Sequence, residues 1–119
     1  MFDVFRRILT VERAVGHFDS DGLWINNQPQ IFTIKASVQA TDAEILQTLP
    51  EGYRTKETYT LYTNTLLKIA EAAVHLADIV IIDSVKFQAV KVTPWQNMMF
   101  ATKHYEVVVV KMDDDNVNQ

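Results

Sequence analysis

Residues 78–97, DIVIIDSVKFQAVKVTPWQN, decide the fold class of this 119-residue chain. Ile79 to Ile82 is continuously apolar, and the next residues, Asp83-Ser84, have the composition of a two-residue turn. After the turn, apolar side chains alternate with Lys86 and Gln88, as in a half-buried strand. The stretch therefore predicts a β-hairpin in which Phe87 faces the core and Lys86 faces water.

The apolar positions change parity at Ala89-Val90 and continue at Val90 and Val92. This change indicates either a β-bulge or a strand that is covered on both faces. The run Tyr105 to Met112, YEVVVVKM, has the same two-sided character. In a domain of this size we expect either a sheet that closes into a barrel or a neighbouring subunit that covers its outside.

Other strands are predicted upstream of the hairpin. In Ile31–Gln39 the residues Phe32, Ile34, Ala36 and Val38 alternate with polar ones, which is typical of a half-buried strand. Weaker strands are expected at about 11–18 and 22–26, joined by the turn DSDG and followed by NNQP. A further strand is expected at 59–63. The fold class is thus mainly β, a small antiparallel barrel or sandwich with one or two short helices.

Two segments have helical features. Thr41-Asp-Ala-Glu44 has the spacing of a capping box and predicts a helix over about 42–48 that ends before Pro50. Between Thr65 and Ala77, apolar residues recur at helical spacing with polar residues opposite. The pattern alone predicts a helix, and the sequence leaves both a helix and a loop open for 65–77.

Composition and charge bound the class of protein. The chain has 48% hydrophobic and 22% charged residues and no cysteine, which predicts one soluble domain over 1–119 without disulfides or thiolate metal sites. Its formal net charge is −4, and the surplus acid lies in 39–60 and in 101–119. Residues 113–119 are expected to form a flexible acidic tail.

The residues that could take part in catalysis or metal binding show no motif typical of either. His17, His75 and His104 belong to three separate predicted elements and have no metal-ligand spacing. Asp78 and Asp83 flank a strand and could act as paired carboxylates, but aspartate at strand ends is ordinary turn chemistry. With three glycines in the chain, a phosphate-binding loop is not expected. We therefore predict no enzyme activity, no catalytic residue, no metal and no cofactor.

An ordered series of features gives the chain a resemblance to a known family. The series is a strand that ends ASVQ, a short helix, LPEG followed by Arg54, the strand YTLYT, the hairpin ADIVIIDSVKFQAVKV, PWQN with Trp95, and the closing HYEVVVVKM. Over about residues 30–112 it resembles the small neck proteins of tailed bacteriophages, the collar or head-closure proteins of the head–tail connector. It departs from them at Asp83-Ser84, where glycine is expected, and at 65–77, which is more apolar than the expected polar loop.

The resemblance implies a structural virion protein, assembled in the bacterial host cytoplasm. It implies a small barrel that forms a homo-oligomeric ring, twelvefold or sixfold, between the portal or adaptor and the tail-terminator or sheath-side proteins. Such a ring closes the head and passes DNA without binding it specifically, and it has no membrane partner. A nucleic-acid-binding barrel is the alternative, but the acidic, scattered charge predicts weak DNA binding. An enzyme is a third and weaker interpretation.

The predicted interface residues are Phe2, Phe5, Arg6, Arg7, Ile8 and Trp95. Phe2, Phe5, Ile8 and Leu9 fall on one side of a short amphipathic helix, which predicts a docking arm within residues 1–10. The alternative for this segment is a plug that packs across the protein's own barrel. Trp95 is expected in the core or at a subunit contact rather than stacked on a nucleic-acid base.

Overall fold

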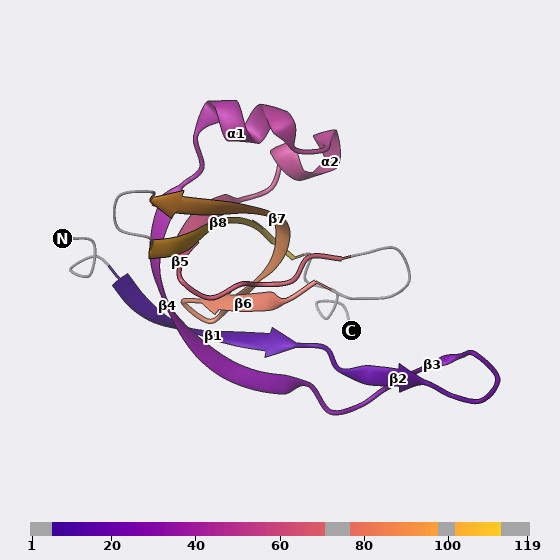
Figure 1. The fold of residues 1–119 in the computed structure, drawn as a ribbon. Coiled ribbons are helices and arrows are strands. Elements are labelled where there is room, and N and C mark those ends of the chain that lie inside the picture. The colour runs from indigo at the N-terminus through magenta and orange to yellow at the C-terminus, as the bar shows by residue number, and fades with distance from the viewer. Residues whose placement is uncertain (1–5, 71–76, 98–101, 113–119) are drawn as a thin grey trace.

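The computed structural model describes residues 6–70, 77–97 and 102–112, and Figure 1 shows a closed barrel with a helical layer on one side. The strand order around the barrel is β1-β4-β5-β8-β7-β6, and all pairs are antiparallel. The barrel strands are β1 Arg6–Arg13, β4 Gln30–Ala40, β5 Thr58–Thr63, β6 Ile79–Ile82, β7 Val85–Asn97 and β8 Thr102–Lys111. The remaining elements are β2 Gly16–Phe18, β3 Trp24–Asn26, α1 Ala43–Thr48 and α2 Glu51–Arg54. The mainly β barrel with two short helices is confirmed.

Alternation along the strands fills the barrel interior. Leu9 and Val11 of β1 point inward, and β1 pairs with both β4 and β6, which closes the sheet. In β4 the predicted inward side is confirmed, because Ile34 and Ala36 are buried and Phe32 packs against the same core. Phe87 of β7 belongs to this core and lies 5.3 Å, between ring centroids, from Tyr59.

The predicted hairpin is confirmed as β6 and β7. Ile82 pairs with Val85, so Asp83 and Ser84 alone form the turn. Both have positive φ, 51° and 69°, which is the combination that a type I′ turn requires. Aspartate tolerates the left-handed region better than most residues, so the turn forms without the glycine that the family resemblance led us to expect.

The change of parity in β7 is a β-bulge. Ala89 pairs with Val109 and Lys91 with Val108, so Val90 is the extra residue.

The apolar residues on both faces of β8 have a separate cause. Val107 and Val109 point into the barrel, whereas Val108 and Val110 point out and are nevertheless buried. Of the two predicted covers for this sheet, closure into a barrel is confirmed.

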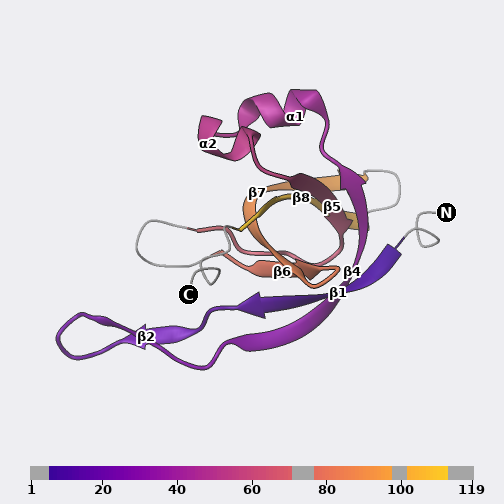
Figure 2. The same ribbon diagram turned by 180° about the vertical axis from the view of Figure 1, so that it is seen from behind.

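The helices lie over β5, β7 and β8 on one side of the barrel (Figures 1 and 2). Leu49 at the end of α1 is buried, Lys91 Nζ donates to Thr48 Oγ1 at 3.0 Å, and Arg54 donates to the carbonyls of Leu49 and Gln47.

The helix predicted at 42–48 is confirmed in position, but the predicted capping box is wrong. Asp42 is the N-cap, without a side-chain cap, because the Thr41 hydroxyl accepts from Thr60 Oγ1 at 3.1 Å.

The segment after β5 is not the predicted helix. Residues 65–70 are not helical, and 71–76 lie outside the described residues. Leu67 is buried in the barrel core. The backbone of Lys68 makes two hydrogen bonds with Asp78. Its N–H donates to Asp78 Oδ2 at 2.8 Å, and its carbonyl accepts from the Asp78 N–H at 2.8 Å. These tertiary contacts override the helical spacing of the sequence.

A buried ion pair holds this segment against β1. Arg13 donates from Nη2 to Asp78 Oδ2 at 2.8 Å and from Nε to Oδ1 at 3.0 Å, a bidentate arrangement. The Asp78 side chain is fully buried, and the guanidinium lies 4.8 Å from the centroid of the Phe32 ring. The hydrogen bonds to Asp78 raise the pKa of Arg13 above its ordinary value, against the opposing effect of burial.

The predicted N-terminal arm is wrong for residues 6–9. Arg6 to Leu9 belong to β1, where they pair with residues 34–37 of β4, and Leu9 is a core residue. The helical spacing in this segment is overridden because strand alternation places Leu9 and Val11 together inside the barrel. Phe2 and Phe5 lie outside the described residues.

Replacing Phe87 by Ala should lower the free energy of unfolding by about 3–5 kcal/mol, because a buried ring is removed from the core. Lys86→Ala removes only an exposed 3.5 Å pair with Glu12 and should cost less than about 1 kcal/mol. Urea denaturation measures both. Equal costs would contradict the assignment of the two faces of β7.

Asp78→Asn should destabilise the fold by about 3–5 kcal/mol, because it leaves the Arg13 charge without its buried partner. Asp83→Asn is a matched control, since Asp83 pairs with Arg7 at 2.6 Å but both side chains are exposed. This control should cost no more than about 1 kcal/mol. Similar thermal stabilities for the two variants would refute the central role of the buried pair.

Candidate interaction surface

A two-stranded hairpin, β2–β3, projects beyond the barrel. It follows directly on β1 and leads into β4, and Figures 1 and 2 show it extending away from the body of the molecule. Gly16 pairs with Asn26, His17 with Ile25 and Phe18 with Trp24. It is separate from the barrel sheet, and each of residues 16–26 is exposed or half-buried.

Asp19 organises the tip of this hairpin. Its Oδ1 accepts from the amides of Asp21 and Leu23, both at 2.9 Å, and its backbone N–H donates to the Leu23 carbonyl at 2.8 Å. Gly22 has φ of 83°, a conformation in which a side chain would be strained. The tip is therefore held in one shape by its own sequence, DSDG, as the turn prediction at this position expects.

One face of the hairpin packs against itself. The Trp24 and Phe18 rings meet edge to face with centroids 5.1 Å apart, and Trp24 Nε1 donates to Asn26 Oδ1 at 2.6 Å. A Cβ on Gly16 would lie 2.6 Å from the Trp24 ring and 2.4 Å from the Ile25 carbonyl oxygen. Only glycine lets the indole lie flat on the backbone at this point.

The hairpin nevertheless exposes large apolar side chains. Phe18 is 53% exposed, Leu23 64% and Ile25 41%. Strand alternation places Ile25 and Leu23 on the face opposite the Phe18–Trp24 pair. A projecting, internally ordered hairpin with three exposed apolar residues has the properties of a contact site for another molecule.

A second apolar surface lies on the barrel. We define the outer wall as the outward side chains of β1, β4 and β6, on the side of the barrel opposite α1 and α2 (Figure 1). Ile8 is 69% exposed and Ile31 58%, and Ile79 and Ile81 on β6 are half-buried. In the part of the chain that the structure describes, neither helix covers this wall. Lys35 pairs with Ile8 across β1 and β4 and is exposed.

The predicted site residues are only partly brought together. Arg6 and Ile8 lie on the outer wall, and Arg7 pairs with Asp83 at the same end of β1. Trp95 lies elsewhere, on the end of the β7–β8 hairpin, where it pairs with His104. The sequence analysis did not identify Phe18, Leu23 and Ile25 as interface residues. The signal was present, because apolar residues flank the turn DSDG in strands too short to be buried on both faces.

The candidates for chemistry do not form a site. Asp78 is buried in its pair with Arg13, while Asp83 is an exposed turn residue, so the two carboxylates have separate structural roles. His17 Nδ1 lies 3.1 Å from Asn27 Oδ1 and His104 Nδ1 lies 3.0 Å from Asn64 Oδ1, whereas His75 is outside the described residues. Among residues 6–70, 77–97 and 102–112, no three histidine or acidic side chains are placed to hold a metal ion.

Comparison with known proteins adds no relative. No family model matches this chain, and no curated protein matches it significantly. Among the described residues, no helix has the length and apolar character needed to cross a membrane.

Gly16→Ala should loosen the hairpin, because the added methyl group overlaps the Trp24 ring and the Ile25 carbonyl, a strain of about 1–3 kcal/mol. Faster exchange of the Asp19 and Asn27 amide hydrogens, which are bonded within the hairpin, would report this opening. Gly52→Ala in α2 is the control, since a Cβ there meets nothing within 4 Å. Unchanged exchange in Gly16→Ala would show that the indole does not depend on this glycine.

Proposed function

We propose that this protein is a structural component that assembles into a ring in the neck of a tailed bacteriophage, between the portal and the tail. In this role the barrel is a rigid body, and its projecting parts contact neighbouring copies and the layers above and below. The ring closes the filled head and lets DNA pass to the tail.

The observation that carries the proposal is the β2–β3 hairpin. Its tip is fixed by Asp19, yet it exposes Phe18, Leu23 and Ile25 beyond the barrel. Exposing such side chains on a monomer is unfavourable, and burying one completely is worth about 1.5–3 kcal/mol. An assembly subunit gains this free energy when the hairpin meets its neighbour.

The assignment to the phage neck draws on the ordered sequence features of residues 30–112. Closed barrel topology and a helical layer over one side are the architecture that the resemblance implies. Arg54 of the LPEG segment donates to the end of α1, and the Asp83-Ser84 turn joins the Asp-bracketed hairpin. These quoted segments thus occupy defined structural positions, which supports the resemblance as one of architecture.

The net charge of the chain favours a ring through which DNA passes over a protein that binds nucleic acid. The formal net charge is −4, and on the hairpin Asp19 and Asp21 add negative charge to the projecting tip. Sequence-independent affinity for DNA depends on cationic contacts with phosphates, and an acidic surface provides few. A weakly interacting surface suits a ring through which DNA moves.

Light scattering and negative-stain electron microscopy of the purified protein test the proposal. We expect rings, with the twelvefold or sixfold symmetry that the resemblance implies. Leu23→Asp should weaken assembly by about 1.5–3 kcal/mol per contact while the barrel stays folded, because it removes an apolar side chain from the contact. Leu66→Asp is the matched control, since Leu66 is also exposed but lies outside the hairpin and the outer wall.

Two outcomes would contradict the proposed function. One is a protein that stays monomeric at every concentration, alone or with purified portal rings. The other is micromolar, salt-sensitive binding to a random single-stranded oligonucleotide, which would favour a nucleic-acid-binding barrel. We expect such binding no tighter than roughly the millimolar range at physiological salt.

A further inference from the structure

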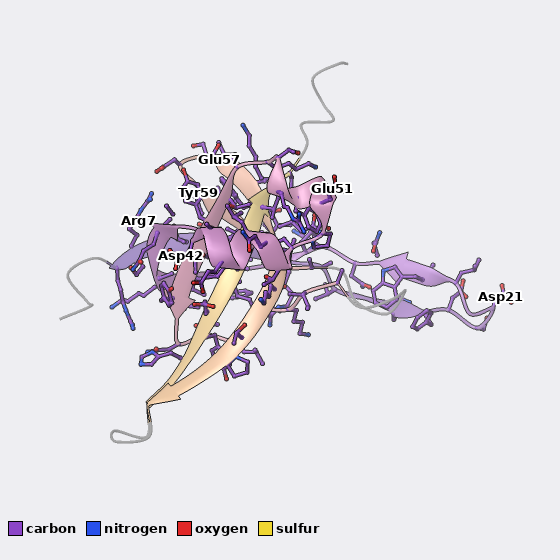
Figure 3. The ribbon with its side chains drawn as sticks, turned by 90° about the horizontal axis from the view of Figure 1, so that it is seen from above. Arg7, Asp21, Asp42, Glu51, Glu57 and Tyr59 are labelled. Atoms are coloured by element: carbon purple, nitrogen blue, oxygen red, sulfur yellow. The ribbon has the colours of Figure 1, made fainter. Side chains whose placement is uncertain are left out.

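The two exposed apolar surfaces of one molecule cannot meet each other. Figure 3 places Asp21, at the tip of the hairpin, and Arg7, beside Ile8 of the outer wall, at opposite ends of the molecule. The hairpin also continues the direction in which β1 and β4 leave the barrel (Figure 1). A contact between the hairpin tip and the Ile8 region therefore requires two copies of the chain.

The two surfaces match in chemical character. Leu23 and Ile25 form an aliphatic face on the hairpin, and Ile8 and Ile31 are the most exposed aliphatic residues of the outer wall. Leu23 and Ile25 are two residues apart on the hairpin and form one patch. Ile8 and Ile31 lie at the two ends of the β1–β4 pair, because Ile8 pairs with Lys35 and Ile31 with Glu12.

The surfaces also match in charge. The hairpin residues 16–26 hold two aspartates, Asp19 and Asp21, and no lysine or arginine. The outward residues of the wall and of the adjoining β7 edge include three cations, Arg6, Lys35 and Lys86, against one acid, Glu12. Lys35 is exposed directly beside Ile8. An acidic tip with an aliphatic face thus complements the end of the wall where Ile8 lies beside Lys35 and near Arg6.

We propose that the hairpin of one copy docks on the Ile8 end of the outer wall of the next, with Leu23 and Ile25 against Ile8 and with Asp21 near Lys35. This inference rests on the proposed ring function and names the two faces of its subunit contact. The contact is heterologous, because the docking and receiving surfaces are different. A heterologous contact repeated around a closing rotation produces a ring. The hairpin tip at one end of the molecule and the Ile8 end of the wall at the other provide that arrangement.

The absence of cysteine from the chain makes a direct test by crosslinking straightforward. Leu23→Cys and Ile8→Cys are made as single variants, mixed under assembly conditions and oxidised gently. The proposed contact predicts a disulfide-linked dimer between the two variants. Leu23→Cys mixed with Glu44→Cys is the control, because Glu44 is exposed on α1, on the helix-covered side, and should give no such dimer.

Charge reversal tests the same contact without a crosslink. Lys35→Glu and Asp21→Lys should each weaken assembly by about two- to fivefold per contact, as expected for an exposed charge pair. The double variant Lys35→Glu/Asp21→Lys should recover most of this loss, since it restores the pair with opposite signs. Two single losses that simply add in the double variant would show that these residues do not meet.

The outcomes separate this inference from the proposed function. Rings that form without the Leu23→Cys and Ile8→Cys crosslink would overturn the hairpin-to-wall contact and leave the ring function standing. A crosslink equally strong with Glu44→Cys would also overturn it. Failure of the unmodified protein to form rings, alone or on portal rings, would overturn the proposed function and the contact with it.

Discussion

The buried carboxylate of Asp78 joins three segments that are far apart in the sequence. It receives three hydrogen bonds from Arg13 at the end of β1 and one from the Lys68 amide after β5, and it lies just before β6. An uncompensated charge at this depth would be strongly unfavourable, so the three segments are held together whenever the barrel is closed. The Asp78 carbonyl also accepts from Ala89, next to the bulge of β7. The barrel end beside the hairpin is thereby fixed.

Apolar side chains that point out of the barrel are buried on one side of it and exposed on the other. On β8 the outward residues Val108 and Val110 are buried within the chain, on the side of the helical layer. On the outer wall Ile8 and Ile31 remain exposed. The same sequence feature, apolar residues on both faces of a strand, therefore corresponds to an internal layer in one case and to a proposed subunit contact in the other.

Features that depend on neighbouring residues could be predicted from the sequence, and features that depend on distant partners could not. The alternation of β4 and the turn at Asp83-Ser84 are local, so pattern and turn composition identified them. The helical spacing after Thr65 is local too, but the backbone of Lys68 bonds to Asp78, and residues 65–70 are not helical. Thr41 likewise bonds Thr60 instead of capping α1. The hairpin strands and their turn were predicted, but the exposed surface was missed because the local pattern does not show that the hairpin projects from the barrel.

The attachment of the hairpin to β1 and β4 has a mechanical consequence. A pull on the hairpin along its own length would act on both strands together, and these are held to the barrel by three residue pairs with β6 and five with β5. These hydrogen bonds run across the direction of pull, so they would be loaded in shear and would have to break together rather than unzip one by one. A subunit tethered in this way resists tension through its sheet, a property that would suit the phage ring that we propose.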